Sequence, residues 1–146
     1  NSMQGDRVYK EYFEKISLGT PTLDISDCPD LGPVLIALAS LKNGATLKGT
    51  DRLKAKESDR GEAMHTELAK LGGALVFGDN TIVVPKQKLE YKNNVIDGHN
   101  DHRIVMAMSV ILSKLGGEIA GIEAVKKSYP AFFDDILKLG AEVKIS

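Results

Sequence analysis

The alternation of apolar and polar positions predicts a series of helices and short strands. Segment 31–41 is apolar at almost every position and is followed by Asn43-Gly44, so we expect a helix that is buried on most sides. Three further helices are indicated by apolar residues at helical spacing; they run from Ser58 or Asp59 to Gly72, from Asp101 to Gly116, and from Pro130 to Gly140. A weaker pattern favours another helix at 8–16.

Short strand-like runs lie between these helices. They are 22–25, 45–47, 74–77, 81–84, 95–96, 118–120 and 142–145. Gly78-Asp79-Asn80 separates two of the runs and is typical of a hairpin turn. Because helices and strands alternate, we expect an α/β or α+β fold in which helices pack on sheets.

The sequence also repeats itself at a distance of about 70 residues. Segment 67–75 recurs in similar form at 135–143, and the strand-like segment 44–49 recurs at 116–121. We therefore predict three units that together form a partial domain. They are the end of a truncated first repeat at 1–26, a second repeat at 27–98 and a third repeat at 99–146.

Composition supports a folded domain and excludes binding through bulk charge. The 146 residues are 42% apolar and 27% charged, and the net charge is −1. A near-neutral chain is not built to bind nucleic acid or an anionic membrane through its overall charge. Only four of the 19 cationic residues are arginine, the better bidentate partner for phosphate and carboxylate: Arg7, Arg52, Arg60 and Arg103.

Cysteine usage and the absence of long apolar runs bear on the compartment. Cys28 is the only cysteine, so an internal disulfide is excluded and a reducing compartment is expected. No apolar run approaches the ~20 residues of a membrane span, and the N-terminus lacks the features of a signal peptide. We expect a soluble, cytoplasmic protein. Because Asn1 is not an initiator methionine, we also expect a piece of a longer chain.

Polar residues gather where the predicted helices begin. These positions are Asp30, the run 56–60 (Lys-Glu-Ser-Asp-Arg), the run 101–103 (Asp-His-Arg) and Lys126-Lys127. A helix N-terminus offers free N–H groups and positive potential to an anion, and a cation placed there strengthens that potential. In a repeated fold these helix starts would lie on the same side, which predicts an anion site.

Each of these residues also has an ordinary structural explanation. Asp30, Ser58, Asp59 and Asp101 are common N-cap residues, and single lysines such as Lys56 and Lys127 are commonly solvated. Arg60 and Arg103 argue for a site, because a purely structural helix start would favour an acid at these positions.

Two carboxylates at helix starts suggest acid and base chemistry. Glu57 lies between Lys56 and Arg60, where a bound anion would raise its pKa toward that of a proton donor, and Asp30 could act as a base. This pair suits addition or elimination at an anionic substrate. A metal site on His99 and His102 is the weaker alternative, because no third strong ligand lies in a fixed motif.

Four linked motifs resemble the C-terminal part of the 5-enolpyruvylshikimate-3-phosphate synthase family. They are Cys28-Pro29-Asp30, Lys56-Glu57-Ser58-Asp59-Arg60, Asn100-Asp101-His102-Arg103 before an apolar helix, and the run 127–133 (Lys-Ser-Tyr-Pro-Ala-Phe-Phe). Their order and spacing agree with the family over nearly the whole chain. The resemblance implies an inside-out α/β barrel of enolpyruvyl transferase type, built from repeats of helices on short mixed sheets.

The resemblance also implies an activity without a metal or organic cofactor. The family transfers the enolpyruvyl group of phosphoenolpyruvate to the 5-hydroxyl of shikimate 3-phosphate, on the route to aromatic amino acids. Asp30 would deprotonate that hydroxyl and Glu57 would protonate the methylene carbon. The remaining roles would be divided as follows: Lys56 for the shikimate phosphate, Arg60, Arg103 and Lys127 for phosphoenolpyruvate, and His102 for orientation beside Arg103.

The chain departs from the family in two respects. Arg52 stands where the family commonly has asparagine or an acid, and the family chain is about three times as long. We therefore expect a C-terminal domain fragment that is inactive without its N-terminal domain. The alternatives are a UDP-N-acetylglucosamine enolpyruvyl transferase of the same superfamily and a non-catalytic anion-binding module that reuses the repeat.

Overall fold

A computed structural model describes residues 2–55, 59–90, 92, 95–99, 101–115 and 119–120. Helix α1 (Ser2–Leu18) precedes a four-stranded sheet made of β1 (Thr22–Asp24), β2 (Ala45–Lys48), β3 (Val76–Gly78) and β4 (Thr81–Val84). Helices α2 (Gly32–Leu41) and α3 (Arg60–Lys70) lie between these strands in the sequence, and α4 (His102–Leu115) follows them. Short 3₁₀ segments occupy Pro29–Leu31 and Thr50–Ala55.

The four-stranded sheet is mixed, with the order β1-β2-β4-β3. Strands β1 and β2 run parallel with Leu23 opposite Leu47, while β4 runs antiparallel to β2 and to β3. The predicted hairpin forms between β3 and β4. Its Asn80 has a φ of 51°, in the left-handed region that asparagine tolerates better than most residues do.

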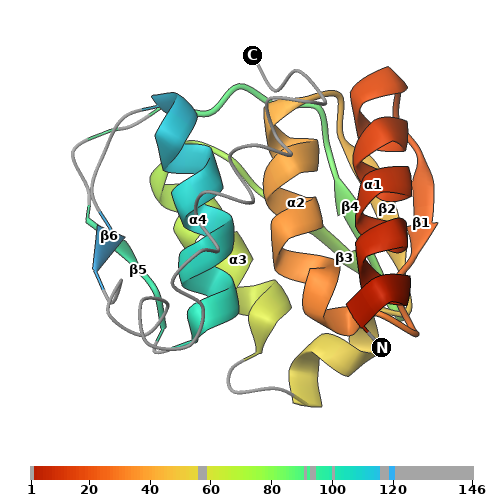
Figure 1. Ribbon diagram of the computed structural model, residues 1–146. Helices are drawn as coiled ribbons and strands as arrows, with labels where there is room; N and C mark the ends of the chain where they lie inside the picture. The colour runs from red at the N-terminus through yellow and green to blue at the C-terminus, as the bar shows by residue number, and fades with distance from the viewer. Residues whose placement is uncertain are drawn as a thin grey trace.

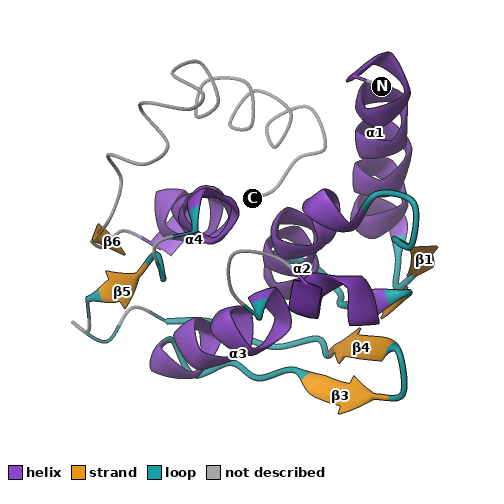
Figure 2. Ribbon diagram, turned by 90° about the horizontal axis from the view of Figure 1, so that it is seen from below, coloured by secondary structure: helices purple, strands orange, loops and turns teal. Residues whose placement is uncertain are grey.

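Helix α2 lies at the centre of the molecule. Figure 1 shows it between α1 and α4, in front of the sheet, and Figure 2 shows the same layers from below. All residues of α2 except Leu41 are buried, which is the outcome that an almost wholly apolar segment predicts. Its core neighbours belong to one apolar cluster that extends from Phe13 to Leu112.

A second, smaller sheet pairs β5 (Ile96–Asp97) with β6 (Ile119–Ala120) in parallel. Helix α4 connects these strands, just as α2 connects the parallel strands β1 and β2. The described chain thus contains one β–α–β arrangement twice. The division into repeats at 1–26, 27–98 and 99–146 stays a prediction.

Most predicted elements within the described residues are confirmed, with small shifts at their ends. The helix expected at 8–16 is longer and runs over Ser2–Leu18, and the strand expected at 74–77 begins only at Val76. The 3₁₀ segment Thr50–Ala55 was missed, because Leu53 alone gives it no apolar period. The helix predicted at 130–140 and the strand at 142–145 lie outside the described residues.

None of the described helices is both long enough and apolar enough to cross a membrane.

Candidate functional site

Arg60 and Asp101 form a buried ion pair between the starts of α3 and α4. Arg60 is only 2% exposed and Asp101 is fully buried. Arg60 Nε donates to Asp101 Oδ2 at 2.8 Å, and Nη2 donates to Oδ1 at 3.1 Å. Two parallel hydrogen bonds of this kind match the planar guanidinium to the carboxylate and fix the two helix starts relative to each other.

Asp30 meets the other edge of the same guanidinium. Arg60 Nη1 donates to Asp30 Oδ1 at 2.9 Å, while half of the Asp30 side chain remains exposed. Asp30 lies in the 3₁₀ turn that leads into α2. One buried arginine therefore holds a buried carboxylate and an accessible carboxylate, which come from equivalent places before α2 and α4.

Arg103 completes the group from the first turn of α4. Its Nη2 lies 3.7 Å from Asp30 Oδ2, and 28% of its side chain is exposed. The Arg103 N–H donates to Asp101 Oδ1 at 3.0 Å, so Asp101 satisfies a free N–H group of the helix and also binds Arg60. His102 is the first residue of α4 and is half-buried.

The ion pairs affect the protonation of Arg60. Burial alone would lower the pKa of its guanidinium, but the hydrogen bonds and charges of Asp101 and Asp30 outweigh burial and raise that pKa above its ordinary value. Arg60 is therefore a permanent cation at the junction of three elements.

The start of α3 is well defined by its cap. Asp59 has extended backbone angles, and its carboxylate accepts the Glu62 N–H at 3.1 Å. This cap begins the helix at Arg60 and so places the arginine in the first turn, facing the starts of α2 and α4. Helix α3 then continues along the buried residues Met64 and Leu68.

The structure brings together three of the site residues that we predicted from the sequence. Asp30, Arg60 and Arg103 share one network of ion pairs, and His102 adjoins it in the chain. Lys56, Glu57 and Lys127 lie outside the described residues. Arg52, the departure from the family pattern, is exposed.

Sequence reasoning missed two parts of this region. The sequence places Asp101 in the polar run 101–103 and explains it as a helix cap, but it does not indicate that Asp101 is the buried partner of Arg60. Glu67 is fully buried and binds Lys70 and His99, at 2.7 Å and 2.6 Å. Its position between Met64 and Leu71 at helical spacing was the available signal, because a carboxylate on a buried face needs partners.

The histidine that prompted the metal alternative is engaged with this carboxylate. His99 Nε2 lies 2.6 Å from Glu67 Oε2. Over the parts of the chain that the structure describes, no three His, Cys, Asp or Glu residues are grouped as a metal would require.

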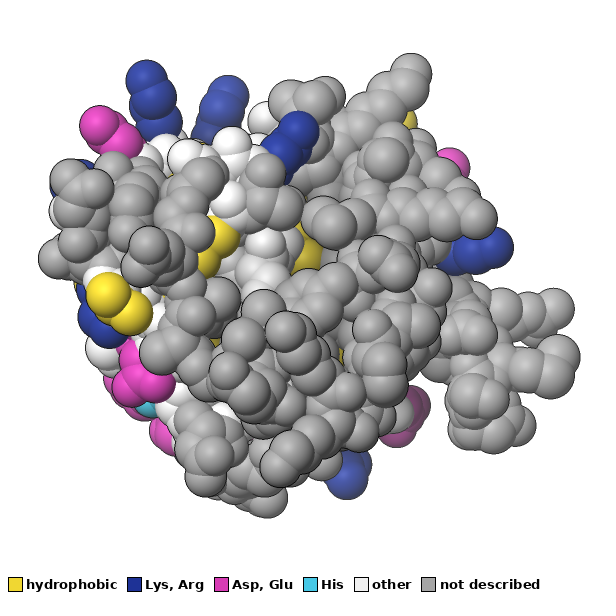
Figure 3. Space-filling view, turned by 60° about the vertical axis from the view of Figure 1, so that its left-hand side comes forward, with side chains coloured by type: hydrophobic (Ala, Val, Ile, Leu, Met, Phe, Trp, Pro, Cys, Tyr) yellow, Lys and Arg dark blue, Asp and Glu magenta, His cyan; other side chains and the backbone are white. Residues whose placement is uncertain are grey.

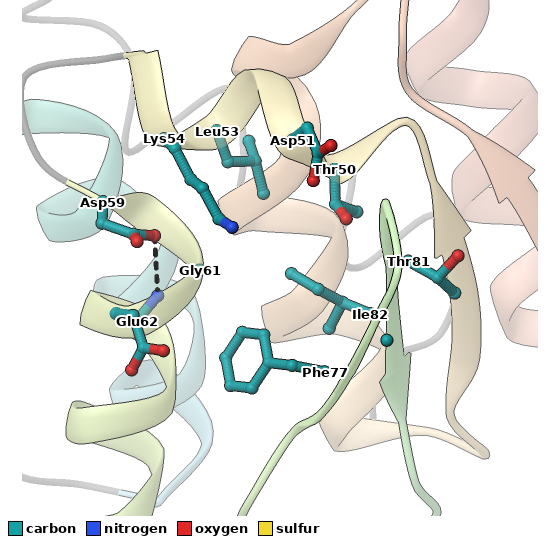
Figure 4. Close-up of a pocket in the computed structure, with 11 residues that line it drawn as sticks. Thr50, Asp51, Leu53, Lys54, Asp59, Gly61, Glu62, Phe77, Thr81 and Ile82 are labelled. Carbon is teal, nitrogen blue, oxygen red and sulfur yellow. Dashed lines mark hydrogen bonds between the residues drawn. The ribbon is translucent and has the colours of Figure 1, made fainter.

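A small pocket lies on another side of α3. It encloses about 100 Å³ between the Thr50–Ala55 turn, the start of α3 and the β3–β4 hairpin. Figure 4 shows Lys54 and Phe77 pointing into it, with Asp59 bonded to the Glu62 N–H at its edge. Among the site residues that the structure describes, Asp30, Arg60, His102 and Arg103 do not line this pocket, so the candidate site is defined by the converging charges instead.

The charges of one face agree with a local site. In Figure 3, the Lys and Arg side chains drawn lie mainly along the upper part and sides of the view, and acidic side chains gather at the lower left. This face has no broad positive surface among the described residues.

Comparisons with known proteins agree with the motifs. The family model for EPSP synthase (3-phosphoshikimate 1-carboxyvinyltransferase) matches residues 4–136. The 3-phosphoshikimate 1-carboxyvinyltransferase of Clostridium kluyveri is 36% identical over 98% of this chain, and that of Sulfurisphaera tokodaii is 37% identical over 84%. Among solved structures, EPSP synthase from Acinetobacter baumannii aligns with a TM-score of 0.58 at 29% identity over 77% of this chain.

These alignments cover only part of each relative. The chain spans 38% of the Clostridium kluyveri protein, 30% of the Sulfurisphaera tokodaii protein and 26% of the Acinetobacter baumannii chain. The predicted α/β fold of enolpyruvyl transferase type is confirmed by the structural match together with the helices and mixed sheet observed here. A family model that matches 4–136 and relatives this similar show that the chain belongs to the EPSP synthase family.

Proposed function

We propose that this chain supplies the C-terminal part of an enzyme that transfers the enolpyruvyl group of phosphoenolpyruvate to the 5-hydroxyl of shikimate 3-phosphate. The observation that carries the proposal is the convergence of Asp30, Arg60 and Arg103 at the starts of three different elements. An accessible carboxylate beside an accessible guanidinium can take a proton from a hydroxyl while an anionic co-substrate is held nearby.

In this proposal Asp30 is the base. Arg60 holds one oxygen of its carboxylate, and the exposed half of the side chain leaves room for a hydroxyl to approach. Two nearby guanidinium groups favour the ionised form that a base requires. Because the same guanidinium groups stabilise the carboxylate, they also make it a weaker base. The hydroxyl of the substrate must therefore be held in hydrogen-bonding position for its proton to transfer.

Arg103 and Arg60 have different parts in the proposal. Arg103 is partly exposed and can bind the carboxylate or phosphate of phosphoenolpyruvate directly. Arg60 is buried against Asp101, so only the Nη1 edge that now contacts Asp30 can reach a substrate. Its first effect is to hold Asp30 in place.

The remaining roles follow from family membership. Glu57 donates a proton to the methylene carbon, Lys56 binds the phosphate of shikimate 3-phosphate, and Lys127 binds phosphoenolpyruvate. His102 orients Arg103 from the preceding position in α4. No metal or organic cofactor takes part.

The reaction then balances without a redox step. The hydroxyl oxygen bonds to C2 of phosphoenolpyruvate, its proton passes to Asp30, and Glu57 protonates C3 to give a tetrahedral adduct. Glu57 then takes a proton back from C3, which reforms the double bond as the bond from C2 to the phosphate oxygen breaks, and the proton held by Asp30 passes to the departing phosphate. The products are an enolpyruvyl ether and inorganic phosphate.

The proposed partner is an N-terminal domain of the same enzyme type, because the chain spans 38% of its Clostridium kluyveri relative. The test is phosphate release from phosphoenolpyruvate and shikimate 3-phosphate after this chain is mixed with the N-terminal portion of that relative. We expect turnover by the mixture and none by either part alone.

Matched variants separate the site from the fold. Asp30→Asn keeps the shape of the side chain but removes the base, so we expect the rate of the mixture to fall by about 100-fold or more. Asp79→Asn changes an exposed carboxylate in the hairpin and should leave the rate unchanged. Turnover by the chain alone would refute the need for a partner, and a mixture that responds only to UDP-N-acetylglucosamine would refute the substrate.

A further inference from the structure

Glu67 is a fully buried carboxylate that the proposed chemistry does not use. It lies on the face of α3 that also carries the buried Met64 and Leu68. A carboxylate in such a place is destabilising unless charged partners or hydrogen bonds compensate for its lost solvation.

All three partners of Glu67 within the described part of the chain are hydrogen-bond donors. Oε1 accepts from Lys70 Nζ at 2.7 Å and from the Asp97 N–H at 2.8 Å, and Oε2 meets His99 Nε2 at 2.6 Å. Lys70 is on α3 itself, whereas Asp97 and His99 belong to β5 and the turn after it. The carboxylate therefore ties α3 to the segment that leads into α4.

Further contacts make this segment rigid. Lys70 Nζ also donates to the Val95 carbonyl at 3.3 Å, and the His99 N–H donates to the Asp97 carboxylate at 3.0 Å. His99 has a φ of 55°, a left-handed conformation that is uncommon for residues other than glycine.

The held segment ends directly at the candidate site. The Asp101 N–H donates to the Gly98 carbonyl at 3.0 Å, and Asp101 in turn binds Arg60. Glu67 and Arg60 are seven residues apart on one helix, a distance of about 10 Å along its axis. Helix α3 thus contacts the approach to α4 at two points, segment 95–99 through Glu67 and Asp101 through Arg60.

We propose that Glu67 is a positioning residue, which holds segment 95–99 so that Asp101 and Arg103 are presented correctly at the start of α4. That Asp101 and Arg103 belong to a substrate site rests on the proposed function. The contacts of Glu67 are independent of it. Its physical basis is that a buried charge with three donors has one satisfactory arrangement, whereas an apolar side chain would pack in several.

Hydrogen exchange of backbone amides, followed by NMR on the 146-residue chain, tests the proposal. In Glu67→Gln the charged acceptor is lost, so the Asp97 amide should exchange at least about tenfold faster. Residues 101–103 should also exchange faster, while Leu23 and Leu47 in the large sheet should not change. Glu62→Gln, an exposed substitution on the same helix, is the matched control and should leave all these rates unchanged.

A second pair of variants separates positioning from mere folding. His99→Gln keeps a donor that can reach Glu67 and should retain most of the protection at 97–103, whereas His99→Ala should lose it. Both variants place a residue other than glycine at the position whose φ is 55°, so their difference reports the contact to Glu67. This pair also decides the matter if Glu67→Gln does not fold.

Titration with phosphoenolpyruvate in the presence of shikimate 3-phosphate links the segment to the site. The Arg103 amide signal should shift in the wild-type chain as phosphoenolpyruvate is added. In Glu67→Gln the phosphoenolpyruvate concentration at the midpoint of this shift should be about tenfold higher. If the chain alone does not respond, the same titration is made on its mixture with the N-terminal portion; a silent mixture counts against the proposed function, and exchange at 101–103 then decides about Glu67. Unchanged exchange at these residues, or faster exchange with an unchanged midpoint, would overturn the proposal.

Discussion

At the scale of single residues, the contrast between Asp101 and Asp30 is the most informative. Both carboxylates bind Arg60, but Asp101 is fully buried and half of Asp30 is exposed. Removing one member of a buried ion pair leaves an uncompensated charge, whereas an exposed pair contributes little to stability. The same type of contact should therefore have very different energetic weight at the two positions.

We expect Asp101→Asn to lower the free energy of unfolding by about 3–5 kcal/mol, because Arg60 would keep its charge without its buried partner. Asp30→Asn should lower it by at most about 1 kcal/mol. Urea denaturation followed by circular dichroism measures both. Equal losses in the two variants would contradict the different burial of the carboxylates.

Cys28 gives a prediction for alkaline pH. Partial burial, together with the charges of Asp27 and Asp24, raises the pKa of its thiol above the ordinary value of 9.0. The unfolded chain then loses the thiol proton first as the pH rises. The stability that comes from keeping the thiol neutral is therefore complete below pH 9.0 and is lost above it.

The corresponding measurement compares the wild-type chain with Cys28→Ala between pH 7 and pH 10.5. The difference in unfolding free energy should be constant below about pH 9 and should move in favour of the variant above it. A difference that stays constant over the whole range would show that Cys28 does not contribute to the alkaline loss of stability.

At the scale of elements, the end of α2 depends on a glycine. Gly44 has a φ of 90°, and its N–H donates to the Ala39 carbonyl at 3.0 Å as the helix gives way to β2. A Cβ atom at this position would meet the Val84 carbonyl oxygen of the neighbouring strand. Backbone conformation and close approach both require glycine here.

We expect Gly44→Ala to lower the free energy of unfolding by about 2–3 kcal/mol. Gly19→Ala is the matched control, because a Cβ atom there would have no neighbour within 4 Å, and it should change stability by at most about 0.5 kcal/mol. Thermal unfolding of the two variants makes the comparison. A destabilised Gly19→Ala or a tolerated Gly44→Ala would show that the turn is not specified as described.

At the scale of the whole molecule, the two sheets share one core. The apolar cluster that begins at Phe13 in α1 reaches Leu112 in α4, and α2 contacts both of these helices. Because the helices of the two sheets are buried against each other, unfolding of one sheet would expose the apolar core of the other. The described part of the chain should therefore unfold as one unit.

This arrangement predicts a single unfolding transition. In urea, circular dichroism and the NMR signals of Leu23 and Ile96, which report on the two sheets, should change with the same midpoint. Leu68→Ala, a truncation in the buried face of α3, should move both midpoints together and cost about 2–5 kcal/mol. A lower midpoint for Ile96 alone would show that the smaller sheet is a separate unit.

Local residue patterns were enough to predict the elements and the chemical groups of this protein. Local periodicity and turn chemistry were sufficient to predict elements that depend on neighbours within a few residues. These elements are the apolar run of α2, the hairpin at Gly78-Asp79-Asn80 and the start of α4. The motifs that contain Asp30, Arg60 and Arg103 were likewise visible, because residue type and spacing alone suggested an anion site and a family.

Which of these groups pair with one another depends on contacts between residues that are far apart in the sequence. Arg60 and Asp101 are 41 residues apart, and Glu67 and His99 are 32 residues apart. No local pattern shows that one guanidinium is buried between two carboxylates or that a carboxylate holds a distant turn. These pairings follow from packing α2, α3 and α4 into one core, which forces their charged ends together and leaves each charge only the partners that the fold provides.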